Sequence, residues 1–281
     1  MTSRLAEFLN PRSIALVGCP GDLTRPGARP VVYLRRHGYP GNVYPVNPRH
    51  AEIGGYKAYP SLSAVPERPD VVWIGVPGAQ VLDALEEAAR LGIPNAVILT
   101  AGFAETDAAG RSLQARLTEL AEGAGIAVLG PNMLGFINCW ERVPLTFSPA
   151  GGLEPLVPGA LGIASQSGAL AGIVVNRAFD RNIGVSAMVS TGNEAGITVS
   201  ECLEYFAEVA EKEGRLTSNG KPVAPFNRRD AARARGWAKR LRAGWTPPAD
   251  AGFDPDPVQQ GLPAATGGFP SDTTPADVEI D

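Results

Sequence analysis

The sequence predicts an α/β protein with a parallel sheet, followed by a smaller α/β region and a tail of different composition. Short apolar runs alternate with helix-length stretches over residues 13–138, which is typical of βαβ units. A second, shorter alternation covers residues 161–209. From Glu211 onward the composition shifts to Arg, Ala, Pro, Gly and Asp.

The first region contains predicted strands at residues 14–17, 42–46, 71–76, 96–100 and 126–129. Most of them are continuous apolar runs, as expected for a parallel sheet that helices cover on both faces. Two amphipathic helices are predicted at residues 81–92 and 106–125, and a Gly-Ile-Pro sequence ends the first of them. Five strands with helical crossovers predict a complete Rossmann-like domain over residues 1–140.

The second region is shorter and follows a connector that contains Pro and Gly. Its predicted elements are strands at residues 161–164 and 185–191 and helices at residues 168–180 and 199–209. Two strands are too few for a stable doubly wound sheet. Residues 141–210 are therefore predicted to form a partial domain.

The last region, residues 211–281, is predicted to be a disordered tail. It has a basic block at residues 228–242 and an acidic, Pro-rich end, and it buries too little apolar surface to offset the entropy lost on ordering. The basic block has no interleaved aromatic residues apart from Trp237 and Trp245. A solvated tail is favoured over a segment that binds nucleic acid.

Composition narrows the classes of function. The chain has 281 residues and a net charge of −4, which gives no field that favours nucleic acid. It has no apolar run of the roughly 18 residues that a membrane span needs and no secretory leader, so we expect a cytoplasmic protein. Its three cysteines form no CxxC pair, so no disulfide framework and no metal site are predicted. We expect a small ligand.

The turn after the first predicted strand is a candidate anion site. It contains Gly18 and Gly21, and Gly27 follows. Glycines allow a close approach of the backbone to a phosphate, and the start of the next helix favours an anion. The spacing lacks the GxGxxG pattern of dinucleotide-binding domains, which weakens the nicotinamide interpretation. Taken alone, the turn is equally well explained as a structural corner.

Asn47 and Arg49 follow the second predicted strand, where NAD-binding domains usually carry an acidic residue for the ribose. A cation at this place suits a ligand with a phosphate on its ribose, and both NADP and coenzyme A (CoA) have one. The alternative is that the Asn-Pro pair is only a turn.

Three further turns lie at the same predicted sheet edge. Val76 and Pro77 end the third strand, Gly102 follows the fourth, and Asn132 follows the fifth. Open α/β sheets bind ligands beyond the carboxyl ends of their strands. We therefore group these residues with the first two turns as candidate contacts of a nucleotide-like ligand.

The second region contains another candidate anion site. It is a turn from a predicted strand into a predicted helix, with the sequence Ser165, Gln166, Ser167 and Gly168. The start of a helix attracts an anion through its free N–H groups and its dipole. The spacing does not fit the GxSxG nucleophile elbow, so a serine hydrolase is disfavoured.

Eight segments in order resemble the CoA-binding and ligase segments of NDP-forming acyl-CoA synthetases, relatives of the succinyl-CoA synthetase alpha subunit. The segments are NPRSIALVG, VYPVNP, AYPSL, VPGAQV, TAGFAE, GPNMLGFIN, ASQSGALAG and STGNEAG. They cover residues 5–209, and agreement of several motifs in order is more specific than one glycine turn. The resemblance implies a CoA-binding Rossmann-like domain and a partial flavodoxin-like ligase domain.

The resemblance also implies roles for residues. The first glycine turn would hold phosphates of CoA, and the other turns would line the nucleotide; the implied CoA-binding residues are Gly18, Gly21, Gly27, Asn47, Arg49, Val76, Pro77, Gly102 and Asn132. Ser165, Ser167 and Gly168 would hold phosphate or the phosphoryl group of a phosphohistidine. Glu194 lies where the family has a carboxylate that orients this histidine, or it is only an acidic residue at a helix start.

Two departures from the family pattern stand out. Cys19 and Pro20 replace an Ala-Ser pair, which removes a hydroxyl and a backbone donor from the phosphate loop. Met133 replaces a cysteine, which changes packing more than chemistry. We expect CoA affinity to be lower than in the family.

The family reaction converts an acyl-CoA, phosphate and ADP into an acid, CoA and ATP through a phosphohistidine downstream of these motifs. The chain has only His37 and His50, both in the first region. A segment long enough for an ATP-grasp domain is also missing. We therefore expect no catalytic residue here and a chain that is inactive alone, either C-terminally truncated or frame-disrupted, or a subunit completed by a separate ATP-grasp chain. A homo-oligomer is the other possible partner.

Three functions remain as hypotheses. The first is a synthetase-like protein that binds CoA or an acyl-CoA. The second is a CoA-responsive regulatory module that uses the same site. The third, an NADP-dependent oxidoreductase, is disfavoured by the missing GxGxxG pattern.

Overall fold

A computed structural model describes residues 4–212, 217–218, 221–222 and 239. Met1–Gly244 forms one compact unit, which contains every helix and strand of the described residues. The predicted disordered tail lies almost wholly outside the described residues, so that prediction is not tested. Helix α6 ends at Lys212, three residues beyond its predicted end.

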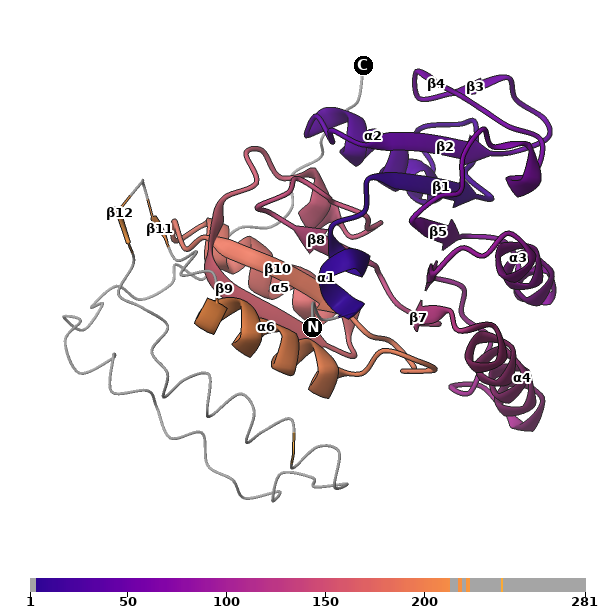
Figure 1. Ribbon diagram of the computed structural model, residues 1–281. Coiled ribbons are helices and arrows are strands. Elements are labelled where there is room, and N and C mark those ends of the chain that lie inside the picture. Colours follow the sequence, from indigo (N-terminus) through magenta and orange to yellow (C-terminus); the bar gives the residue numbers. More distant parts are fainter. Residues whose placement is uncertain (1–3, 213–216, 219–220, 223–238, 240–281) are drawn as a thin grey trace, which may run out of the picture. The chain divides into compact units, whose positions relative to one another are not determined.

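The first sheet has five strands, all parallel, in the order β2-β1-β5-β6-β7 (Figure 1). The strands are β1 (Ser13–Val17), β2 (Asn42–Val46), β5 (Val71–Ile74), β6 (Asn95–Ile98) and β7 (Ala127–Leu129). This confirms the parallel α/β domain that the sequence predicts. In chain order the strands lie 2-1-3-4-5, so the direction of winding reverses between β1 and β5.

Helices cover both faces of this sheet because neighbouring side chains of a strand point to opposite sides. Ile14 and Leu16 of β1 belong to one buried cluster, whereas Ala15 belongs to the other. The helices are α1 (Arg4–Leu9) and α2 (Arg29–Arg36) on the first face and α3 (Gly78–Arg90) and α4 (Ala108–Ala124) on the second.

Short elements complete this domain. They are the hairpin β3 (Glu52–Ile53) and β4 (Tyr56–Lys57) and the 3-10 turns η1 (Pro26–Ala28) and η2 (Leu62–Ala64). The hairpin is linked to the main sheet by an isolated bridge between Val46 and Tyr59.

The second sheet has three strands in the order β8-β10-β9, one more than predicted. They are β8 (Phe136–Asn138), β9 (Pro158–Ser165) and β10 (Val185–Ser190), with the 3-10 turn η3 (Pro149–Gly152) in the connector. Strand β10 pairs with β9 in parallel and with β8 in antiparallel fashion. The prediction of two strands was wrong. Strand β8 is only three residues long and comes shortly after the turn at Asn132, so it gave no separate strand pattern.

Two helices lie on opposite faces of this second sheet, α5 (Gly168–Phe179) and α6 (Val199–Lys212) (Figure 1). The core beneath α5 is separate, but Val189 of β10 and Cys202 of α6 belong to the cluster that also contains Ile14 and Leu16. One hydrophobic core therefore continues from the first sheet into the second.

Two small strands follow, β11 (Thr217–Ser218) and β12 (Lys221–Pro222), which form an antiparallel pair. None of the described helices is both long enough and apolar enough to cross a membrane.

Candidate functional site

A cleft of about 1010 Å³ opens where β1 and β5 end, at the reversal of the sheet winding. Ligands of doubly wound sheets bind at this place, beyond the carboxyl ends of the strands that flank the reversal. The cleft brings together most of the predicted CoA-binding residues, namely Gly18, Gly21, Gly27, Asn47, Arg49, Val76 and Pro77.

Gly18 is required by the geometry of the first turn. Its φ of +80° is in the region that favours glycine, and a Cβ there would lie 2.7 Å from Cγ1 of Val76 and 2.8 Å from the carbonyl oxygen of Gly75. The turn after β1 and the turn after β5 thus touch each other. This contact sets the floor of the cleft.

The side chain of Asn47 connects two turns of the cleft. Its Nδ2 donates to the carbonyl oxygen of Cys19 (3.0 Å), and its Oδ1 accepts from the N–H of Arg49 (2.9 Å). Both polar atoms of the side chain are used within the protein. Asn47 therefore shapes the cleft between the Gly18 turn and Arg49.

Cys19 is only 2% exposed, and burial raises the pKa of its thiol to about 12. A thiol with this pKa stays protonated and inert at neutral pH. The cysteine therefore acts as a packing residue in the glycine turn.

The two carboxylates that line the cleft already have partners. Asp22 accepts from the N–H and Oγ1 of Thr24 (3.0 and 2.7 Å), and these bonds lower the pKa of its carboxyl group. Glu87 of α3 accepts from the N–H and Oγ of Ser63 (3.1 and 2.6 Å). Neither acid pairs with a cation of the cleft.

Sequence reasoning missed several residues of this cleft, including Arg25, His50, Ser61 and Gln80. Arg25 was visible as a basic residue beside the first glycine turn, and His50 directly follows Arg49. Ser61 and Gln80 stand within the family-like segments AYPSL and VPGAQV, but no ligand role was assigned to them.

Gly102 and Asn132 are not in the cleft. They lie at the ends of β6 and β7, where the loop before α6 packs against the first domain. The N–H of Gly102 donates to Oε1 of Glu105 (2.6 Å), and Nδ2 of Asn132 donates to Oδ1 of Asn193 (3.2 Å). The sheet edge therefore has two distinct regions, the cleft at β1 and β5 and a junction between domains at β6 and β7.

Asn193 is the centre of this junction. Its Nδ2 donates to Glu105 and to Oε1 of Gln114 (3.0 Å), and its Oδ1 accepts from Asn132. Partial burial would raise the pKa of the Glu105 carboxyl, but the donors from Asn193, Gly102 and Phe103 together lower it. The ionised carboxylate thus stabilises the junction.

Ser165, Ser167 and Gly168 form the turn from β9 into α5. Ser167 is the N-cap of α5, since its Oγ accepts from the N–H of Leu170 (3.3 Å). Oγ of Ser165 accepts from the N–H of Ser167 (3.1 Å) and donates to the carbonyl oxygen of Ser167 (3.1 Å). Gly168 is buried against Leu134, whose Cβ would lie 2.7 Å from a Cβ at Gly168.

Glu194 lies next to this turn, because the N–H of Thr191 donates to the carbonyl oxygen of Ser165 (2.9 Å). Its Oε1 accepts from Oγ1 of Thr191 (3.0 Å) and from the N–H of Val199 (2.9 Å), the first residue of α6. Glu194 therefore serves at a helix start, as one of the two alternatives expects. The histidine-orienting role stays a prediction.

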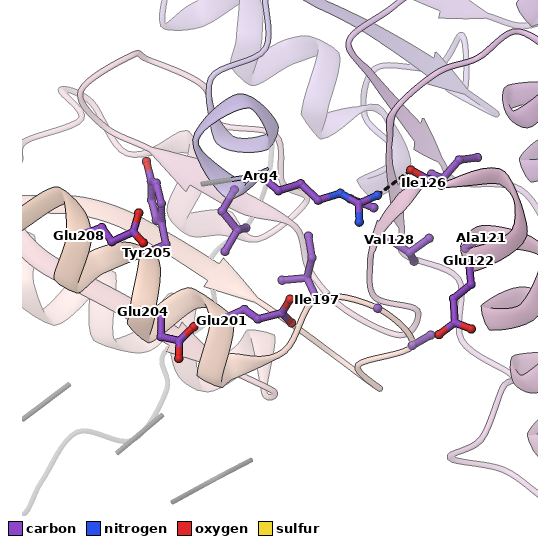
Figure 2. Close-up of a pocket in the computed structure, with 15 residues that line it drawn as sticks. Arg4, Ala121, Glu122, Ile126, Val128, Ile197, Glu201, Glu204, Tyr205 and Glu208 are labelled. Atoms are coloured by element: carbon purple, nitrogen blue, oxygen red, sulfur yellow. Dashed lines mark hydrogen bonds between the residues drawn. The ribbon is translucent and has the colours of Figure 1, made fainter. Parts of the chain in front are cut away.

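A second cavity, of about 520 Å³, lies between α1, the end of α4 and α6 (Figure 2). Arg4 crosses it and donates from Nη2 to the carbonyl oxygen of Gly125 (2.7 Å). Glutamates of α6 line its opposite side, and Glu201 among them accepts from the N–H and Oγ1 of Thr198 at the start of that helix. None of the predicted site residues is here.

No group of three or more His, Cys, Asp or Glu side chains suited to a metal occurs within the described part of the chain. The three cysteines are free and buried.

The fold and the cleft define an α/β protein with a nucleotide-type ligand site at a sheet reversal, joined to a second α/β domain. Residues 12–138 match the family described as CoA binding domain, and residues 158–214 match the succinyl-CoA ligase like flavodoxin domain. The chain thus carries the CoA-binding and succinyl-CoA ligase-like domains of ADP-forming acyl-CoA synthetases.

Two curated relatives illustrate the similarity. The alpha subunit of the ADP-forming acetate–CoA ligase II of Pyrococcus furiosus is 35% identical over 207 residues, which are 74% of this chain and 44% of the relative. A trans-feruloyl-CoA synthase from an unknown prokaryotic organism is 36% identical over 206 residues, 73% of this chain and 29% of the relative. The chain spans less than half the length of either relative.

A solved structure agrees with these relatives. The dinucleotide-forming acetyl-coenzyme A synthetase 1 of Ca. Korarchaeum cryptofilum, in complex with phosphate and ADP, superposes with a TM-score of 0.68. It is 35% identical in sequence, and the match covers 73% of this chain and 43% of that chain.

Proposed function

We propose that this chain binds CoA or an acyl-CoA in the cleft at the ends of β1 and β5. The observation that carries the proposal is the cleft itself, which has glycine turns at its floor, cationic side chains at its rim and carboxylates that are already engaged. The match of residues 12–138 to the CoA binding domain supports CoA over other nucleotides.

Arg49 is the residue we assign to the 3′-phosphate of CoA. It lies in the cleft after β2, where ribose-binding residues of such domains occur, and its side chain has no hydrogen bond or ion pair within the described residues. The other predicted cleft residues would line the nucleotide. Gly102 and Asn132, which do not line this cleft, stay proposed CoA contacts on the resemblance alone.

We further propose that the turn at Ser165, Ser167 and Gly168 binds phosphate, and that these 281 residues do not perform the complete ligase reaction alone. The family reaction needs a phosphohistidine near this turn, whereas both histidines of the chain belong to the first domain. A separate subunit would have to supply the rest. Three free cysteines are consistent with a reducing, cytoplasmic compartment.

Isothermal titration calorimetry with CoA, acetyl-CoA and NADPH tests the ligand. We expect CoA and acetyl-CoA to bind and NADPH to bind much more weakly. Binding of NADPH without binding of CoA would refute the proposal. Turnover assays with and without an added ATP-grasp subunit then separate a synthetase component from a CoA-responsive regulatory module, since both use the same cleft.

Replacement of Arg49 by alanine tests the place of the 3′-phosphate. Because the lost contact is a charge-assisted one, we expect Arg49→Ala to weaken CoA about tenfold and dephospho-CoA less than twofold. Arg12→Ala is the matched control, since this arginine lies outside the cleft and is 92% exposed in its side chain. Equal losses for the two ligands would contradict the role of Arg49.

A further inference from the structure

Three cationic or titratable side chains line the cleft, those of Arg25, Arg49 and His50. Arg25 comes from the turn before η1, and the other two come from the turn after β2. None of the three side chains has a hydrogen bond or an ion pair within residues 4–212. Each is therefore available to a ligand.

The carboxylates of the cleft do not compete for these side chains. Asp22 is bonded to Thr24, and Glu87 is bonded to Ser63. The charged groups that line the cleft with His50 are these two acids and the two arginines. Arg25 attracts the Asp22 carboxylate and helps to lower its pKa, but no ion pair forms between them, so an anionic ligand meets cations that no acid holds.

The imidazole of His50 has a defined position against the glycine turn. A Cβ placed on Gly21 would lie 2.5 Å from Nε2 and 2.8 Å from Nδ1 of His50, so the ring rests on the bare Cα of Gly21. The N–H of His50 donates to the carbonyl oxygen of Asn47, whose side chain also bonds to Cys19. The backbone that carries the ring is therefore tied to the same turn on which the ring rests.

We propose that His50 binds the pyrophosphate of CoA together with the Gly18–Gly21 turn and makes ligand binding depend on pH. This inference rests on the proposed function, because it assigns a residue and a form of regulation to the same cleft. Histidine gains its charge between about pH 8 and pH 5. Binding should therefore strengthen as the pH falls, while the two arginines keep a constant charge.

Dephospho-CoA is the appropriate probe for this proposal. It lacks the 3′-phosphate, a monoester that changes its own charge near about pH 6, and it keeps the pyrophosphate. Any change in its affinity between pH 6 and pH 8 then reports on the protein. Calorimetry with the full chain measures the dissociation constant at both values.

For the wild-type protein we expect the dissociation constant of dephospho-CoA to be about fivefold lower at pH 6 than at pH 8. His50→Gln, which keeps a polar side chain without charge, should bind weakly at both values with less than a twofold difference. His50→Lys should remove the pH dependence while retaining affinity. Equal melting temperatures of the variants show that the fold is kept.

His37→Gln is the matched control, because this second histidine lies at the end of α2 and its Nε2 contacts the carbonyl oxygen of Gly151 (2.9 Å), away from the cleft. It should keep the wild-type pH dependence. A pH dependence that survives in both His50 variants, or a wild type that binds equally at both values, would overturn the role of His50. A wild type that binds neither CoA nor dephospho-CoA at either pH would instead refute the proposed function.

Discussion

Ser167 combines two roles at one hydroxyl group. It caps α5 by accepting from the N–H of Leu170, and it is a proposed ligand of phosphate. An aspartate separates these roles because it caps a helix as well as serine does but repels an anion. The two contributions can therefore be measured independently.

We expect Ser167→Ala to lower the free energy of unfolding by about 1 kcal/mol and Ser167→Asp to leave it nearly unchanged. Phosphate should raise the melting temperature of the wild type but not that of Ser167→Asp, because a ligand stabilises only the state that binds it. Scanning calorimetry with and without phosphate measures both effects.

Asp107→Ala is the control for this experiment. Asp107 caps α4 by accepting from the N–H of Gly110 (2.8 Å), far along the chain from the phosphate turn. This variant should lose stability like Ser167→Ala and still respond to phosphate. A phosphate response that persists in Ser167→Asp would show that the anion does not bind at this turn.

At the residue scale, the sequence predicted which turns face the ligand but not what their side chains do there. Asn47 was expected to contact the ligand, and the structure shows its Oδ1 bonded to the N–H of Arg49 in the same turn and its Nδ2 bonded to the carbonyl oxygen of Cys19 in the neighbouring turn. Such bonds depend on the spacing between two loops, which a single sequence does not contain. The role of Glu194 was left between two alternatives for the same reason, because its bond to the N–H of Val199 depends on the path of the loop before α6.

At the scale of elements, the loop from Thr191 to Ala195 joins the two domains through side-chain hydrogen bonds. Asn193 is hydrogen-bonded to Glu105 after β6, to Asn132 after β7 and to Gln114 within α4. In addition, Oγ1 of Thr118 donates to the carbonyl oxygen of Ala195 (3.1 Å). Glu105 is the one ionisable member of the Asn193 group. This makes the junction sensitive to acid.

The folded pKa of Glu105 is lowered from its usual value of 4.5. Its contribution to stability is therefore complete above the unfolded pKa and is lost as the pH falls through the folded pKa. We expect Glu105→Gln to melt at a lower temperature than the wild type at pH 7, and the difference to shrink as the pH falls below 4.5. Melting curves between pH 7 and pH 3 measure this.

Glu119→Gln on α4 provides the comparison, since this exposed carboxylate makes no hydrogen bond within the described residues. It should follow the wild type at every pH. If the Glu105→Gln difference stayed constant down to pH 3, the carboxylate would not stabilise the junction through its charge.

The long periodic elements of the first domain were predictable, and the short ones were not. Strand β2 was predicted at its observed bounds, because the β-prone residues Val43, Tyr44 and Val46 lie close together between turn residues. Helix α2 was expected after the first glycine turn, but no bounds were predicted for it; its buried residues Val31 and Leu34 pack against the sheet. Strand β8 exists only through its pairing with β10.

At the scale of the whole molecule, α5 is apolar on both of its sides. Ala171 and Val175 are buried against the second sheet, while Leu170 and Ile173 are 55% and 56% exposed on the outer side. A helix that is apolar all round is typical of one covered by further protein. This agrees with the small size of the second sheet.

We therefore expect the chain to associate as its concentration rises, and the double change Leu170→Gln with Ile173→Gln to reduce this association. Sedimentation velocity over a range of concentrations measures the effect. Leu23→Gln is the control, because Leu23 is 45% exposed in the first domain and is not part of the α5 surface. A wild type that stays monomeric throughout would contradict this expectation.

Strand β8 has a consequence for how the two domains can be separated. It belongs in sequence to the CoA-binding segment, which ends at residue 138, but it is hydrogen-bonded to β10 of the second sheet. Its Phe136 packs on Phe8 of α1, and Nδ2 of its Asn138 donates to the carbonyl oxygen of Leu9 (3.0 Å). If the chain is divided after residue 138, the first domain keeps β8 without its partner strand, and β10 of the second domain loses its pairing with β8. We therefore expect the two domains to fold together as one unit.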